Sequence, residues 1–270
     1  MDRVATGVTG FDGLVQGGLP AGTNILLTGR PGTGKTIFAL QYLYNGALNG
    51  ENGIYISLDS SVETLRVQAR QLGMDIDAME KQGKIFFLLI PIDRMRFDLF
   101  EMIKDVKKQI NAKRIVFDNI QTFSININLF SIPLGYAGSA ASTVSLTNID
   151  SGKLGMGGSA ARTGSSDTVH YTGNSEKRLI YMIIEELEKM GTTNILISYG
   201  GTSPAHTTID GVSEFACDGI IQMYNELIGV KRERTMSILK MRDTNHSQYV
   251  HSFDIGKGGI TVKAAEAVYQ

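Results

Sequence analysis

The sequence predicts an α/β fold in one domain over 1–270, a mostly parallel sheet flanked by helices with an antiparallel extension at its C-terminal end. Two observations lead to this prediction. Between residues 23 and 200, short apolar runs alternate with amphipathic segments, which is the order of strands and helices around a parallel sheet. After residue 217, short apolar runs follow one another across tight links with no helical segment between them, as in antiparallel sheets.

The first part of the chain supplies the expected parallel core. Strands are expected at 23–29, 52–58, 84–90, 113–118 and 193–200. Amphipathic helices are expected between them, at 35–50, 62–73, 97–110 and 175–191. The run 84–90 has no polar alternation, which favours a strand buried on both faces. The expected C-terminal strands are 218–226, 234–242, 249–255 and 258–262.

Residues 125–174 interrupt this pattern. The segment is rich in Gly, Ser, Thr and Ala and poor in charge. A loop of this length inside a compact domain is unusual and is either functional or disordered. Its composition offers little apolar surface to bury, so we expect a flexible insert.

Composition and charge exclude several classes of protein. Of the 270 residues 42% are hydrophobic, enough for a sizeable core, and the net charge of −1 gives no overall attraction to nucleic acid or to an anionic membrane. Cys217 is the only cysteine, so no internal disulfide forms, and a reducing cytoplasm is expected. No apolar run approaches the ~20 residues of a membrane span, and residues 1–10 lack the apolar core of a signal peptide.

A phosphate-binding loop is expected between the first strand and the first helix. Residues 29–36, GRPGTGKT, match the pattern G-x-x-x-x-G-K-[ST] in the required strand–loop–helix context. Backbone N–H groups of such a loop surround the β-phosphate, Lys35 reaches the β- and γ-phosphates, and Thr36 offers its hydroxyl to Mg²⁺. The expected nucleotide-binding residues are Gly29, Pro31, Gly32, Thr33, Gly34, Lys35 and Thr36.

The magnesium ion of such a site needs a second acidic partner. Asp118 ends the expected strand 113–118, where its carboxylate can reach a metal-bound water near Thr36. We therefore expect ATP and Mg²⁺ as cofactors, with Thr36 and Asp118 as the metal ligands.

With these motifs in place, the chain resembles a known family. Residues 6–36 look like the opening of the KaiC-type ATPases, a branch of the RecA-like superfamily. Residues 210–221, 234–247 and 251–262 look like the C-terminal signature of that family. The resemblance covers nearly the whole chain outside 125–174. It implies a RecA-like core, ATP with magnesium, and rings, often hexamers, with nucleotide between neighbouring subunits. Clock-type members carry two such domains in tandem, and this chain has one.

The resemblance gives the C-terminal signature a role in catalysis. Lys240 and Arg242 are two residues apart, so on a strand their side chains point to the same face. In the family the matching pair reaches the neighbour's γ-phosphate, where cations offset the charge that develops on the transferring phosphoryl group. The alternative is a pair of solvated strand charges. Asp243 stands where the family usually has glycine, and its carboxylate could weaken the field of the Lys240–Arg242 pair or form an ion pair with Arg242.

The resemblance also predicts slow hydrolysis. Family members usually carry two consecutive glutamates after the second strand, at the positions of Asp59 and Ser60 here, and the second readies the attacking water. A serine needs its own activator to act as a base at neutral pH, and Asp59 is one methylene shorter than glutamate. Losing a positioned base typically costs about 10²–10⁴-fold in rate. We expect ATP binding with slow hydrolysis, and list Asp59, Ser60, Lys240 and Arg242 as the catalytic positions.

Three functions remain open. The leading one is a KaiC-like regulatory ATPase, whose ATP occupancy sets ring assembly or the binding of a protein partner. The second is a recombinase-type ATPase that binds single-stranded DNA through the insert and the loop 199–211, although the insert lacks the Lys/Arg excess that phosphate contacts require. The third is a scaffold that binds ATP without hydrolysing it. The clock branch autophosphorylates at a Ser–Thr pair. The resemblance places Glu214 and Phe215 at the matching positions, so we expect no such cycle.

Overall fold

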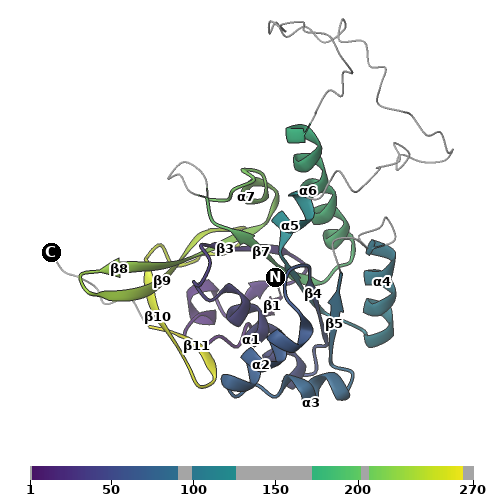
Figure 1. Ribbon diagram of the computed structural model, residues 1–270, viewed down its shortest axis with the longest axis horizontal. Helices are drawn as coiled ribbons and strands as arrows, with labels where there is room; N and C mark the ends of the chain where they lie inside the picture. The colour runs from purple at the N-terminus through teal and green to yellow at the C-terminus, as the bar shows by residue number, and fades with distance from the viewer. Residues whose placement is uncertain (1, 91–98, 126–171, 202–206, 264–270) are drawn as a thin grey trace, which may run out of the picture.

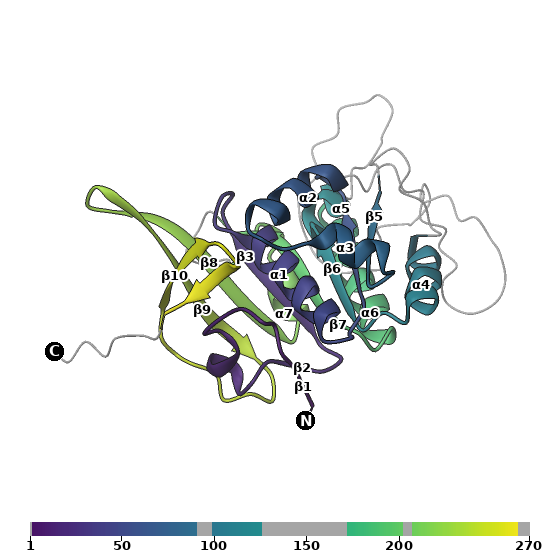
Figure 2. The same ribbon diagram turned by 90° about the horizontal axis from the view of Figure 1, so that it is seen from below.

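A nine-stranded sheet with helices on both faces forms the centre of the molecule, as Figures 1 and 2 show. The computed structural model describes residues 2–90, 99–125, 172–201 and 207–263. The strands of this sheet are β3 (Asn24–Gly29), β4 (Gly53–Ser57), β5 (Ile85–Leu89), β6 (Arg114–Asp118), β7 (Thr193–Tyr199), β8 (Gly219–Ile228), β9 (Lys231–Met241), β10 (His251–Gly256) and β11 (Gly259–Val262). They lie in the order β11-β10-β9-β8-β3-β7-β6-β4-β5, so the predicted α/β class is confirmed.

Two hydrophobic cores fill the space between the sheet and its helices. One face of the sheet shares a core with α1 (Lys35–Leu48), α2 (Val62–Gln71) and α3 (Ile76–Lys81). The other face shares a core with α4 (Leu99–Ile110), α5 (Ile120–Ile125) and α6 (Thr172–Lys189). Ile25 and Leu27 of β3 lie in the first core and Leu26 in the second, because successive side chains of a strand point to opposite faces. Covering both faces explains why the core strands read as continuous apolar runs.

Smaller elements complete the described chain. They are a two-stranded sheet of β1 (Arg3–Val4) and β2 (Leu19–Pro20), the 3₁₀ turn η1 (Asp12–Val15) and the short helix α7 (Ser213–Ala216). None of the helices in the described ranges combines the length and apolar character that a bilayer span requires.

The C-terminal part differs from the expectation in one strand. We expected all strands after residue 217 to form an antiparallel extension, and β9, β10 and β11 do so. β8, however, pairs parallel with β3 and antiparallel with β9. The reason is that the chain crosses from β7 over β3 before it enters β8, with α7 in the connection. The parallel core therefore includes β8, and the antiparallel extension begins at β9.

The strand at 84–90 was expected to be buried on both faces, and this prediction is wrong. β5 is the last strand of the sheet and, among the described strands, pairs with β4 alone. Most of its residues are only partly buried, and Leu89 is 44% exposed. An unbroken apolar run does not distinguish a central strand from an edge strand, because pairing partners lie far away in the sequence.

The segment between the two helices that flank the predicted insert is shorter than the insert that we expected. α5 extends to Ile125, and α6 begins at Thr172, whereas the sequence placed the insert at 125–174. Residues 126–171, which carry the Gly- and Ser-rich composition, lie outside the described residues. The prediction that this segment is flexible therefore stays a prediction.

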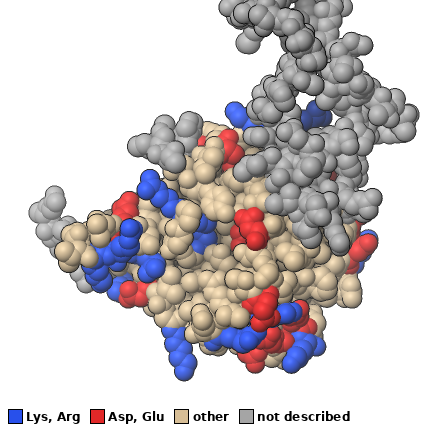
Figure 3. All heavy atoms as spheres, viewed as in Figure 1, with Lys and Arg blue, Asp and Glu red and all other residues tan. Residues whose placement is uncertain are grey.

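Basic and acidic side chains lie interspersed with one another on the face shown in Figure 3. The α2–α3 region carries a network of ion pairs between Arg66 or Arg70 and neighbouring carboxylates such as Glu63 and Glu80. Basic side chains also gather over the end of the β8–β9 hairpin, on the left of Figure 3. There Glu226 pairs opposite Glu233 in the strand register, so acidic groups accompany the basic ones.

Candidate functional site

The carboxyl ends of four parallel strands meet at one cavity. β3, β4, β6 and β7 are neighbours in the parallel part of the sheet, and ligands of such sheets bind where these ends converge. The cavity has a volume of about 330 Å³. It is lined by Pro31, Gly32, Gly34, Lys35, Thr36, Ile37, Asp59, Ser60, Gln68, Asp118, Ile197, Tyr199, Arg234 and Ile255.

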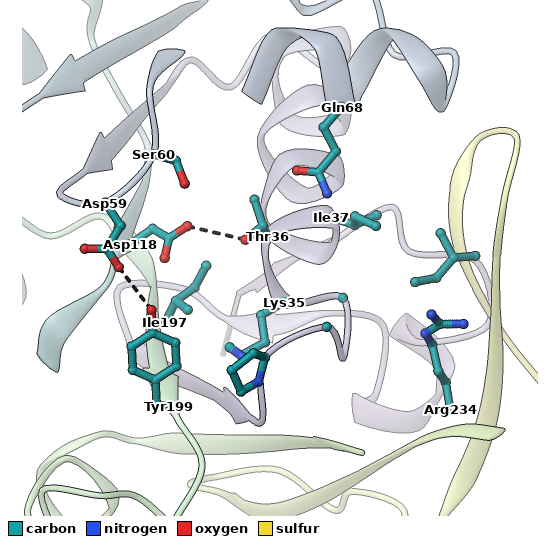
Figure 4. A pocket seen from close by; sticks show the side chains of 14 residues that line it. Lys35, Thr36, Ile37, Asp59, Ser60, Gln68, Asp118, Ile197, Tyr199 and Arg234 are labelled. Carbon is teal, nitrogen blue, oxygen red and sulfur yellow. Dashed lines mark hydrogen bonds between the residues drawn. The ribbon is translucent and has the colours of Figure 1, made fainter. Parts of the chain in front are cut away.

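Figure 4 shows two ends of this cavity, on either side of Lys35 and Thr36. Asp59, Asp118 and Tyr199 gather at one end, with Ser60 above them. Gln68 and Arg234 lie toward the opposite end. The structure thus brings together the phosphate loop, the strand-end acid and the Asp59–Ser60 turn that the sequence singled out.

The loop after β3 needs glycine at both of its ends. Gly29 has φ of 153°, and a Cβ there would lie 2.4 Å from the Met223 carbonyl oxygen of β8. Gly34 has φ of 108°, and a Cβ there would lie 3.0 Å from Ile255. Only glycine adopts such dihedrals without strain and permits this close approach. The loop can therefore curl tightly and lead into α1 at Lys35. The N-terminal end of such a helix favours the binding of an anion.

Lys35 is a buried cation held by the loop itself. Its Nζ donates to the carbonyl oxygens of Gly29 at 2.7 Å and Arg30 at 3.0 Å. Burial lowers the pKa of the Lys35 ammonium to about 8, although the nearby Asp118 carboxylate acts in the opposite direction. A phosphate oxygen is a stronger acceptor for an ammonium than these carbonyls are, because the hydrogen bond is then charge-assisted on both sides.

Thr36 and Asp118 lie together, as the sequence predicted. The Thr36 hydroxyl and the Asp118 carboxylate are 3.5 Å apart, and the hydroxyl of Tyr55 donates to the same carboxylate at 2.6 Å. Burial raises the pKa of Asp118, and the hydrogen bond from Tyr55 opposes this effect. A hydroxyl and a carboxylate are the hard oxygen ligands that suit Mg²⁺, which usually keeps several waters and binds phosphate oxygens besides. These two side chains fit a magnesium ion carried by a nucleotide.

Asp59 is turned toward the ends of β6 and β7 and is held there by several donors. Asn119 and Thr122 both donate to its carboxylate, and the hydroxyl of Tyr199 donates to its Oδ2 atom at 3.2 Å. Three donors thus occupy the carboxylate from neighbouring elements. This arrangement fixes Asp59 in position and leaves little of its acceptor capacity for a water in the cavity.

Ser60 lines the cavity from a turn in which its backbone is held by the side-chain hydroxyl of Ser57. Its N–H donates to Ser57 Oγ at 3.1 Å, and its carbonyl oxygen accepts from the same hydroxyl at 2.7 Å. The position of residue 60 is therefore set by Ser57 and not by the Ser60 side chain.

Lys240 and Arg242 do not line the cavity of their own chain. Lys240 Nζ donates to the Cys217 carbonyl oxygen at 2.6 Å and to two further carbonyl oxygens at the end of α7. Burial lowers the pKa of Lys240, and the neighbouring Arg242 adds to this effect. Arg242 donates to Asp218 at 2.9 Å and keeps 57% of its side chain exposed. The ion pair of Arg242 is therefore with Asp218, and the carbonyl oxygen of Asp243 accepts a hydrogen bond from Arg3.

Sequence reasoning missed several residues of this cavity. Tyr199 could have been found, because it ends a strand predicted to lie in the same parallel sheet. Gln68 of α2 and Arg234 of β9 carry no comparable signal in the sequence. Their presence in the cavity depends on the orientation of α2 and on the length of the β8–β9 hairpin. The Nε atom of Arg234 is buried and, within the described part of the chain, has no hydrogen-bond partner.

Comparisons with known proteins point to one family of ATPases. A family model described as the KaiC ATPase matches residues 4–129 and 168–267. A UPF0273 protein of Aeropyrum pernix is 30% identical over 97% of this chain and 94% of its own length. The circadian clock oscillator protein KaiC of Prochlorococcus marinus is 28% identical over 99% of this chain, which spans 46% of that relative. The crystal structure of a KaiC-like protein from Pyrococcus horikoshii superposes with a TM-score of 0.74 at 30% identity, covering 97% of this chain and 99% of that one.

Proposed function

Since this chain belongs to the KaiC family of ATPases, we propose that it is a regulatory ATPase that binds Mg-ATP between the subunits of a ring and hydrolyses it slowly. ATP occupancy then sets ring assembly or the binding of a protein partner in the cytoplasm. The observation that carries the proposal is the meeting of the glycine loop, Lys35 and the Thr36–Asp118 pair at one cavity.

The proposed nucleotide lies with its phosphates along the loop. Lys35 leaves the carbonyls of Gly29 and Arg30 and donates to the β- and γ-phosphates. Thr36 and Asp118 hold the magnesium ion, which neutralises charge on the phosphate oxygens. The γ-phosphate faces the end of the cavity with Asp59 and Tyr199, and the rest of the nucleotide extends toward Gln68 and Arg234.

A ring explains the placement of the Lys240–Arg242 pair. These two side chains lie outside the cavity of their own chain, and Arg242 is largely exposed. A neighbouring copy can therefore receive them at its γ-phosphate, as the family resemblance implies. Arg242 would exchange its partner Asp218 for a phosphate oxygen, with which a guanidinium forms paired hydrogen bonds. We propose a hexamer, the state often found in the family.

Slow hydrolysis follows from the engaged Asp59 carboxylate and from the serine beside it. Neither residue offers a free carboxylate to the water that attacks the γ-phosphate. The same observation favours a second candidate, a scaffold that binds ATP and never hydrolyses it. Phosphate release under single-turnover conditions separates the two, because a scaffold releases none.

Measurement of the molar mass by light scattering, with and without Mg-ATP, tests the proposed function. The parent protein is expected to assemble into a larger species with Mg-ATP. Lys35→Ala is expected to stay at its nucleotide-free mass, since it lacks the cation on the phosphates. Lys81→Ala, which removes an exposed lysine of α3, serves as the control and should behave like the parent. An unchanged mass and no binding of a fluorescent ATP analogue by the parent would refute the proposal.

A further inference from the structure

Tyr199 lies at the end of the cavity where we place the γ-phosphate, in contact with both Asp59 and Lys35. It is the last residue of β7, the strand between the loop strand β3 and the Asp118 strand β6. Its hydroxyl donates to Asp59 Oδ2 at 3.2 Å, and its ring centroid lies 5.6 Å from Lys35 Nζ. A single side chain therefore touches the acid and the cation between which the γ-phosphate is proposed to lie (Figure 4).

The chemistry of the Asp59–Tyr199 pair differs from that of a free carboxylate. Asn119 and Thr122 also donate to the Asp59 carboxylate, which restricts its rotation. Tyr199 gives its only hydroxyl hydrogen to Asp59, and the Asn119 side chain lies within hydrogen-bonding reach of the phenolic oxygen. A phenolic oxygen has two lone pairs, so one remains to accept a hydrogen bond from a water. A hydrogen bond donated to a carboxylate polarises the phenol and makes its oxygen a better acceptor.

We propose that Tyr199 orients the attacking water through its phenolic oxygen, with Asp59 behind it as the polarising carboxylate. This inference rests on the proposed ATPase function and assigns the water contact to a residue outside the Asp59–Ser60 turn. The water oxygen bonds to the γ-phosphorus while the bond from that phosphorus to the bridging oxygen breaks, and the electron pair stays on ADP. The water hydrogen that Tyr199 oriented passes to an oxygen of the released phosphate. Tyr199 keeps its own proton throughout.

Two further facts support this role for the phenol. Burial and the Asp59 charge raise the pKa of Tyr199, so the hydroxyl stays protonated at neutral pH and continues to donate to Asp59. The other tyrosine of this region, Tyr55, is fully buried, donates to Asp118 and does not line the cavity. Tyr199 is thus the tyrosine, among the described residues, that a water in the cavity can reach.

The test is Tyr199→Phe, which removes the hydroxyl and keeps the ring over Lys35. Single-turnover phosphate release is expected to fall by about tenfold or more, a smaller effect than the ~10²–10⁴-fold of a general base, because Tyr199 orients the water and takes no proton from it. The Kd for an ATP analogue should change less than about twofold, because the hydroxyl acts on the water and not on the nucleotide. Tyr181→Phe, at an exposed position on α6, is the matched control and should leave both values unchanged.

A second background separates this role from a structural one. In Ser60→Glu protein the new carboxylate takes over the water, so adding Tyr199→Phe should lower the rate by less than about twofold. Asp59→Asn should lower the rate as Tyr199→Phe does, and combining the two should give no further loss. An equal loss in both backgrounds, an unchanged rate in Tyr199→Phe, or a parent that binds Mg-ATP and releases no phosphate would each overturn the inference. Failure of the parent to bind Mg-ATP would instead refute the proposed function.

Discussion

Replacing Ser60 with glutamate should raise the rate of ATP hydrolysis without improving ATP binding. The backbone at this position is held by Ser57, which donates to the Ser60 carbonyl oxygen and accepts from the Ser60 N–H. The substitution therefore leaves the turn in place and extends a carboxylate into the cavity that Ser60 already lines. Unlike Asp59, this carboxylate comes without donors that hold it away from the water.

The size of the gain follows from the barrier that a positioned base removes. A general base typically contributes about 10²–10⁴-fold, or about 2.7–5.5 kcal/mol of activation free energy. The new glutamate would lie near Asp118 and Asp59, and the repulsion between carboxylates works against its ionised form. We therefore expect roughly tenfold or more, which corresponds to about 1.4 kcal/mol.

The assay is steady-state phosphate release at saturating Mg-ATP, with the Kd for an ATP analogue measured in parallel. A rise in kcat at unchanged Kd marks an interaction made only in the transition state. Ser60→Gln is the matched control, since it has the same length and no charge, and it should stay as slow as the parent. If Ser60→Glu also stays slow while ATP binds and rings form, our account of this turn is wrong.

Four other predictions concern binding, pH and stability. Lys35→Ala should weaken ATP binding by at least about 1.5–3 kcal/mol, the scale of a charge-assisted hydrogen bond, and unchanged affinity of an ATP analogue would contradict the phosphate-loop assignment. Because the pKa of Lys35 is about 8 and a phosphate restores its charge, ATP affinity should fall as the pH rises through 8, with proton uptake on binding that calorimetry in different buffers detects. Glu51→Gln removes the anion that pairs with the buried Arg114 guanidinium, and urea titration should show a loss of about 1–3 kcal/mol, whereas no loss would mean that the pair is solvated. Deleting residues 135–170 should leave the melting temperature and ATP binding intact, and insoluble protein would show that the segment packs into the core.

Much of the fold and of the candidate site could be predicted because local patterns encode them. The glycine loop joins a strand and a helix that are adjacent in sequence, and Lys35 is the first residue of that helix, so local sequence determines their arrangement. Asp118 was found because a polar residue at the end of an apolar strand marks the edge where ligands bind, and it lies 3.5 Å from Thr36 as expected.

Other features depend on contacts between distant parts of the chain and escaped sequence reasoning. The edge position of β5 depends on which strands pair, and the parallel pairing of β8 depends on a crossover from β7. Asp59 accepts hydrogen bonds from Asn119, Thr122 and Tyr199, which brings together three segments of the chain. Neither the spacing of these residues nor the composition predicts these contacts. In our proposal, these contacts make Asp59 the hydrogen-bond partner of Tyr199 and not a base that acts on the water.

The most direct test of the account mixes two inactive variants, each carrying Ser60→Glu to make turnover measurable. One also carries Arg242→Ala and keeps an intact cavity, and the other also carries Lys35→Ala and keeps Arg242. Each variant alone should be slow, since the first lacks the cation that a neighbour supplies and the second lacks the cation on the bound phosphates. If the site is shared between subunits, the mixture should recover phosphate release. A Lys35→Ala subunit does not assemble by itself, but the ATP-filled cavity of the first variant can bind it and receive its Arg242. A mixture that forms rings and binds ATP yet stays as slow as its separate components would contradict a site completed by the neighbouring copy.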